Sequence, residues 1–183
     1  ILWDNNSRTK FGDIRDYQPI NTLKLYDKNG KEGGLTAEYF SDENFENLFT
    51  SRIEKRIQHE YIDVNDEYPE GFDKNVKAVR WVGEIESDIA GLHKLKLYVS
   101  SYAKMWIDDE LVVDSWRQNW LPWTHNKKVE MEPGKKVKIK IEWIPNGGYI
   151  GLRYLTPEDP IYSTSLSLYS EVADQIDYYF IYG

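Results

Sequence analysis

The feature that most restricts the fold of this chain is a strict alternation of apolar and charged residues. Four apolar side chains, Val137, Ile139, Ile141 and Trp143, are separated by lysine or glutamate at residues 138, 140 and 142. Successive side chains of a β-strand point to opposite faces, so a period of two predicts a strand with one buried and one solvated face. Such strands are typical of antiparallel sheets, and we therefore predict an all-β fold.

A second patterned stretch covers residues 95–116. Residues 95–99 alternate apolar and polar side chains, and two shorter apolar runs, 105–107 and 111–113, then flank the acidic residues 108–110. Alternation followed by a hairpin signal predicts three neighbouring strands joined as a meander in the middle of one antiparallel sheet.

The remaining segments are less regular. Residues 41–54 have a high charge density, which favours a turn with a helical or irregular segment over a strand. Trp81 lies in a clear strand pattern and is expected in the core. Further strands are expected at residues 22–26, 57–62, 77–85 and 149–155.

Two breaks divide the chain. Gly33-Gly34 loosens it before an apolar run, and residues 156–160 hold two prolines and two acids. The stretches before and after these breaks resemble each other in sequence character and differ from the middle, as expected for a domain inserted into a loop of another domain. We therefore expect residues 1–33 and 158–183 to belong to a host β-domain and residues 34–157 to form the insertion. The chain begins with Ile1 rather than methionine, so we expect it to be a piece of a longer protein.

Composition excludes several function classes. The net charge is -8 and no basic stripe reverses it locally, which argues against nucleic acid and anionic membrane as partners. The chain has no cysteine for disulfide or thiol chemistry, and no apolar run reaches the length of about 18 residues that a membrane span needs. It has 7 Trp, 14 Tyr and 6 Phe, so either the sheets are large or some rings face a ligand such as a sugar.

No catalytic or metal-binding constellation is evident. The dense acidic groups, Glu84 with Glu86 and residues 108–110, fit a solvated strand edge and a turn. His59, His93 and His125 are far apart and lack metal-ligand spacing. We therefore expect no catalytic residue, no metal site and no cofactor in this chain.

The candidate binding element is a loop at residues 115–126. Three tryptophans within eight residues are interspersed with planar hydrogen-bonding groups, the mixture that carbohydrate sites use. The alternative is that the rings pack under the loop or against a neighbouring domain. The candidate carbohydrate-binding residues are Trp120, Trp123, Arg117, Gln118, Asn119 and His125.

Five motifs in order resemble the β-sandwich module named from the anthrax protective antigen, the PA-fourteen domain. They are Gly34–Phe40, Ala78–Ile85, Lys104–Trp116, Glu132–Trp143 and Gly151–Pro157. The resemblance implies a two-sheet antiparallel β-sandwich of jelly-roll type, flanked by strands of a host β-sandwich. It also matches Trp116 to a core position of the family.

The calcium-binding adhesin lectins of that family hold the ion with two consecutive aspartates before the hairpin. This chain has residues 100–103, Ser-Ser-Tyr-Ala, at that position, so calcium is not expected.

Residues 1–13 and 170–183 resemble the end of the N-terminal β-domain of glycoside hydrolase family 31, ahead of its catalytic barrel. The resemblance implies that both catalytic carboxylates lie in that barrel, beyond this chain. It predicts a non-catalytic module that binds carbohydrate or shapes the active site of an α-xylosidase-like or α-glucosidase-like enzyme. The expected partners are an oligosaccharide such as a xyloglucan fragment and the barrel of the same polypeptide, in the periplasm or outside a bacterial cell. The alternatives are a structural spacer and an independent adhesin-type lectin.

Overall fold

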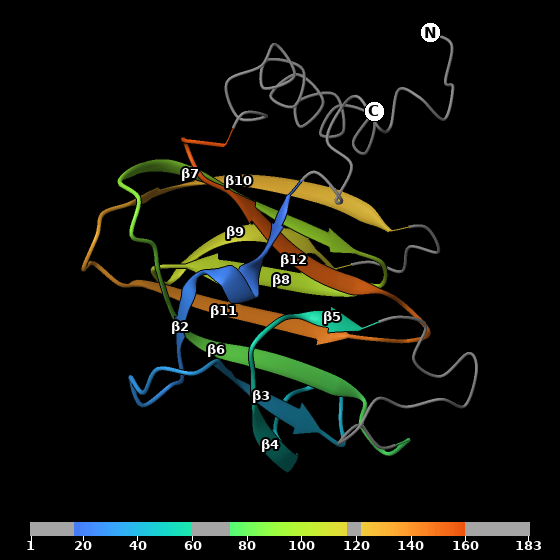
Figure 1. Ribbon diagram of the computed structural model, residues 1–183. Helices are drawn as coiled ribbons and strands as arrows, with labels where there is room; N and C mark the ends of the chain where they lie inside the picture. Colours follow the sequence, from blue (N-terminus) through green and yellow to red (C-terminus); the bar gives the residue numbers. More distant parts are fainter. Residues whose placement is uncertain (1–16, 60–73, 117–121, 160–183) are drawn as a thin grey trace, which may run out of the picture.

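The computed structural model describes residues 17–59, 74–116 and 122–159, and within them the chain forms two antiparallel β-sheets packed face to face (Figure 1). The five-stranded sheet contains, in spatial order, β1 (Gln18–Pro19), β12 (Ile150–Leu155), β7 (Gly91–Val99) and β10 (Trp123–Met131), with β5 (Gln58–His59) also paired to β12. The seven-stranded sheet contains β4 (Leu48–Glu54), β3 (Leu35–Phe40), β6 (Ala78–Glu86), β11 (Val137–Ile144), β8 (Tyr102–Ile107) and β9 (Glu110–Ser115), with β2 (Lys24–Tyr26) also paired to β6. The predicted all-β sandwich is confirmed.

The core lies between the two sheets. All four alternating apolar residues of β11 are at most 2% exposed, and Trp81 of β6 is fully buried, as predicted. On β7, Lys96 is also fully buried although it shares the outer face of its sheet. Its ammonium lies 4.5 Å from the centre of the Tyr17 ring. β7 is therefore buried on both faces, where the alternation predicted only one.

The predicted meander is wrong because β7 and β8 belong to different sheets. The chain crosses between the sheets at Ser100 and Ser101, and Ser101 adopts a positive φ of 71°. The Trp143 indole donates a hydrogen bond to the Ser100 carbonyl (3.2 Å), and the Tyr149 N–H donates one to the Ser100 hydroxyl (2.7 Å). These bonds fix the crossover against the core.

The β8–β9 hairpin follows the prediction. Asp108 and Asp109 at its tip have φ values of 47° and 68°, the left-handed conformation that a type I′ turn requires at both central positions. The Asp108 carboxylate accepts the Lys138 N–H (2.9 Å), which fastens the turn to β11.

Residues 48–54 form a strand, β4, so the expectation of an irregular segment there is wrong. β4 is an edge strand, and Leu48, Phe49 and Ile53 on it are about half exposed. A strand without a continuous buried face has no alternation to reveal it in the sequence. The strand expected at residues 57–62 is present as β5 and is described only to His59.

The sandwich extends on the N-terminal side of the expected boundary at Gly33-Gly34. β1 pairs with β12 and β2 pairs with β6, so residues 18–26 contribute to both sheets. A Cβ at Gly83 would lie 2.1 Å from the Tyr26 carbonyl oxygen, and only glycine lets β2 approach β6 so closely. The assignment of residues 1–16 and 160–183 to a host domain falls outside the described residues and remains a prediction.

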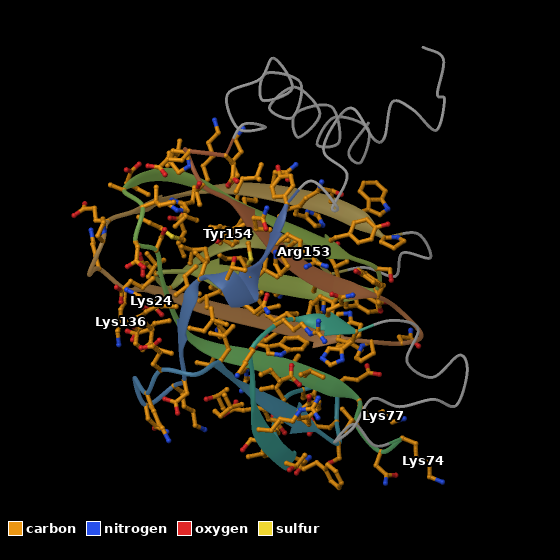
Figure 2. All side chains as sticks on the ribbon, in the orientation of Figure 1. Lys24, Lys74, Lys77, Lys136, Arg153 and Tyr154 are labelled. Atoms are coloured by element: carbon orange, nitrogen blue, oxygen red, sulfur yellow. The ribbon has the colours of Figure 1, made fainter. Side chains whose placement is uncertain are left out.

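Side chains reinforce the contact between β2 and β6. The Lys24 ammonium forms ion pairs with Glu86 and Asp88, and the Tyr26 hydroxyl donates to Glu86 (2.8 Å). Lys136 lies 3.5 Å above the Tyr26 ring, which brings Lys24 and Lys136 to the same end of the sandwich (Figure 2). These contacts hold β2 to the seven-stranded sheet.

No helix in the described ranges is both long and apolar enough to cross a membrane.

Candidate functional site

The tryptophan-rich loop begins and ends at edge strands of the two sheets. β9 is the last strand of the seven-stranded sheet and β10 the last strand of the five-stranded sheet, and the loop joins them. Trp116 follows β9, and Trp123 is the first residue of β10. Four of the six candidate residues, Arg117, Gln118, Asn119 and Trp120, fall outside the described residues, and their roles remain predictions.

Trp123 and His125 lie on the same face of β10. Strand pairing sets Trp123 opposite Val99 and His125 opposite Leu97, both of which point into the core. Both side chains are half-buried, and β10 is the last strand of its sheet among the described residues. The structure therefore brings these two candidates together at the rim of the core, where a ring can be partly packed and partly accessible.

Trp116 is 40% exposed, so its expected core position is wrong. It follows Ser115, the last paired residue of β9, and lies on the opposite side of the strand from the buried Ser115. Its ring is 5.8 Å from that of Tyr102, and the Lys104 ammonium lies 4.7 Å from its centre. Trp116 thus belongs to the outer face of the seven-stranded sheet.

Two further aromatic residues lie near the start of β10. Tyr98 shares its face of the sheet with Thr124, and the Tyr149 ring makes an edge contact with Tyr98 at 5.2 Å. Both were absent from the candidate set because β7 lies between β10 and β12 only in the folded sheet. The one sequence feature that could have pointed to this aromatic pair is Tyr149, directly after the Pro-Asn-Gly-Gly turn.

A buried carboxylate, Glu54, is the centre of a polar cluster that joins four strands. It accepts hydrogen bonds from the Tyr39 hydroxyl, the Trp81 indole (2.7 Å) and the Arg52 guanidinium (2.8 Å). The His59 ring nitrogen lies 3.4 Å from the same carboxylate, and its ring contacts those of Trp81 and Trp143 at centroid distances of 5.7 and 6.1 Å, while the two indoles lie 6.2 Å from each other.

Burial opposes ionisation of Glu54 and by itself would raise its pKa. The hydrogen bond and coulombic attraction of His59, together with the hydrogen bonds from Tyr39 and Trp81, outweigh burial and lower the pKa of Glu54 to about 2. Burial and the nearby carboxylate raise the pKa of Tyr39. The Glu54 side chain is only 8% exposed, so this cluster ties β4 to the core and does not reach a substrate.

The described residues hold no group of three or more His, Cys, Asp or Glu side chains placed to bind a metal ion. At the position where calcium-binding relatives are expected to carry aspartates, Ser100 bonds to the β11–β12 connection.

Comparison with known proteins identifies similar chains. The family model described as the PA14 domain matches residues 31–169. A crystal structure of the glycoside hydrolase family 31 α-xylosidase Xac1773 from Xanthomonas citri is 40% identical, with a TM-score of 0.66, over 80% of this chain and 16% of that one. The anti-sigma-I factor RsgI3 of Acetivibrio thermocellus is 25% identical over 80% of this chain and 22% of its own length. A β-glucosidase from Kluyveromyces marxianus, solved with glucose, is 19% identical with a TM-score of 0.57, covering 74% of this chain and 18% of its own. The chain therefore spans less than a quarter of each of these relatives.

Proposed function

This chain belongs to the PA14 domain family, and we propose that it is a non-catalytic carbohydrate-binding or active-site-shaping module of a glycoside hydrolase family 31 enzyme. The observation that carries the proposal is the 40% identity to an α-xylosidase over 80% of this chain. Sequence similarity at that level supports the proposal that this chain, like the similar part of the α-xylosidase, is a module of a larger glycosidase.

The proposed ligand is a plant oligosaccharide such as a xyloglucan fragment, and the proposed partner is a catalytic barrel in the same polypeptide. Trp123 and His125 contribute an aromatic face and a planar hydrogen-bonding group at the rim of the sandwich, and residues 117–120 of the loop supply further groups of both kinds. An enzyme acting on such fragments works in the periplasm or outside the cell.

Binding measurements on the chain separate this proposal from its two alternatives. We expect calorimetry to detect binding of xyloglucan oligosaccharides with the same affinity with and without chelator. Affinity that vanishes with chelator would instead support an adhesin-type lectin, because calcium would then hold the sugar. If neither the chain nor a longer form containing the barrel needs the loop to bind the oligosaccharide, the spacer role is favoured.

Trp123→Ala should weaken oligosaccharide binding about five- to thirtyfold, because an aromatic contact with a sugar contributes about 1–2 kcal/mol. Trp106→Ala is the matched control, since Trp106 lies on the outer face of the other sheet, beneath Lys140. In the parent enzyme, kcat/KM for oligosaccharides should fall relative to kcat/KM for a small aryl glycoside. An unchanged ratio in both Trp120→Ala and Trp123→Ala, at normal stability, would argue against sugar contact by the loop.

The chain alone should not hydrolyse aryl α-glycosides. Glycoside hydrolysis needs two carboxylates across the scissile bond, and the family resemblance assigns both to the barrel. Release of xylose or glucose at a rate proportional to the concentration of purified chain would contradict this expectation.

A further inference from the structure

The outer face of the seven-stranded sheet carries two apolar rows with a charged row between them. Strand register and ring contacts define the rows, each running across the strands. The first apolar row is Leu48, Phe40, Ala78, Ile144, Tyr102 and Trp116. The charged row is Glu38, Arg80, Glu142, Lys104 and Asp114. The second apolar row is Ile53, Thr36, Val82, Lys140, Trp106 and Leu111, and it is interrupted by the polar Thr36 and the charged Lys140.

The ends of the two apolar rows are unusually exposed. Leu48 and Ile53 on β4 are 53% and 52% exposed, and Trp116 and Leu111 at the opposite edge are 40% and 44% exposed. Of the large apolar side chains exposed to this degree in the described ranges, only Phe49 and Leu92 lie elsewhere. Phe40, Ala78 and Ile144, between two of these corners, are buried and pack with Phe45 and Tyr102, so the exposed apolar surface of this face lies at its corners.

The chemistry of this face fits a protein better than a sugar or a polyion. The charged row alternates in sign, and Arg80 bonds to Glu142 (2.9 Å) while lying 3.7 Å from Glu38, so the row carries little net field. The tryptophan rings each have a lysine ammonium over one face, Lys104 over Trp116 and Lys140 over Trp106. Leu48, Ile53 and Leu111 are aliphatic and offer no ring for a sugar to stack on.

We propose that a second copy of this chain packs against this face, related by a twofold axis that runs along the strands between β6 and β11. The operation places β4 opposite β9, β3 opposite β8 and β6 opposite β11 of the other copy. Glu38 then faces Lys104 and Arg80 faces Glu142, so these charges meet the opposite sign, whereas Lys140 faces Val82. A twofold axis across the strands would oppose like charges and is disfavoured.

The same operation pairs the exposed corners. Leu48 meets Trp116 of the other copy, and Ile53 meets Leu111. Phe45, whose ring packs 5.5 Å from that of Phe40, projects from the face and meets the Tyr102 region of the other copy. All four exposed apolar corners are therefore covered by one symmetric contact.

The face is large enough for a stable interface. Six strands spaced about 4.8 Å apart, each about six residues long, make a flat area of roughly 30 Å by 20 Å. Standard interfaces bury about 800 Å² of accessible surface on each partner, which a face of this size with projecting side chains can supply. Facing sheets pack about 10 Å apart with their strands inclined by about 30°, and two copies of this face can pack in that way.

Sedimentation equilibrium of the 183-residue chain tests the dimer. We expect a monomer–dimer equilibrium, and Leu111→Lys should raise its dissociation constant about tenfold or more because it buries an unpaired charge at a corner. Leu92→Lys is the matched control, since Leu92 is 37% exposed on the five-stranded sheet, and it should leave the constant unchanged. A chain that is monomeric throughout, or equal effects of the two variants, would overturn the proposal.

Mixing two variants tests the pairing itself. Ile53→Glu should also weaken the homodimer, but a mixture of Ile53→Glu and Leu111→Lys copies should form a heterodimer in which one new glutamate meets one new lysine. Labelling one variant reveals the heterodimer directly. Two variants that keep the wild-type melting temperature and stay monomeric on mixing would exclude this interface.

Discussion

Acidification from about pH 4.5 to pH 2 should reduce the free energy of unfolding by about 3 kcal/mol through Glu54 alone. The pKa of this carboxyl is about 2 in the folded chain, against its ordinary value of 4.5. A group with a depressed folded pKa stabilises the protein above its unfolded pKa, and the stabilisation is lost as the pH falls toward the folded pKa. Each pKa unit corresponds to about 1.4 kcal/mol, which gives the stated magnitude.

Glu54→Gln provides the comparison. The amide cannot ionise, so the variant should be less stable than the wild type near pH 7 and should lose less stability in acid. Its loss near neutrality has a structural cause, since Arg52 would lack its carboxylate partner. Urea unfolding at a series of pH values measures both effects, with Glu110→Gln in the exposed hairpin as the control. Parallel pH curves for wild type and Glu54→Gln would show that this carboxylate does not govern acid stability.

The Glu54 cluster could not be predicted from the sequence. Its four partners come from β3, β4, β5 and β6, and β4 itself was expected to be irregular. Local alternation did predict β11 and the burial of Trp81, because each depends on one strand and one buried face. β7 and β8 belong to different sheets because β7 pairs with β10 and β8 pairs with β11, both later in the chain. The local pattern of residues 95–116 does not indicate these pairings.

The candidate site shows the same limit. Composition identified the tryptophan loop, and the structure places its last members, Trp123 and His125, on one face of an edge strand. The family resemblance placed Trp116 in the core, but the burial of a residue after the last pair of an edge strand depends on what neighbouring strands supply. Tyr98 and Tyr149 meet only because β7 and β12 are paired.

Trp143→Ala should destabilise the chain by about 3–5 kcal/mol, while Trp116→Ala should cost about 1 kcal/mol or less. Trp143 is fully buried, its ring stacks with His59, and its indole N–H bonds to the Ser100 carbonyl at the crossover between the sheets. Its removal leaves a cavity between the sheets and an unpaired carbonyl.

Thermal unfolding followed by circular dichroism compares the two variants directly. For a chain of this size, a loss of 3–5 kcal/mol lowers Tm by roughly 10 °C, whereas Trp116→Ala should shift it by only a few degrees. The two substitutions delete the same side chain, so the difference between them isolates burial as the cause. Equal shifts in Tm would mean that Trp116 is as deeply packed as Trp143, contrary to its 40% exposure, and would return it to the core position that the family resemblance implied.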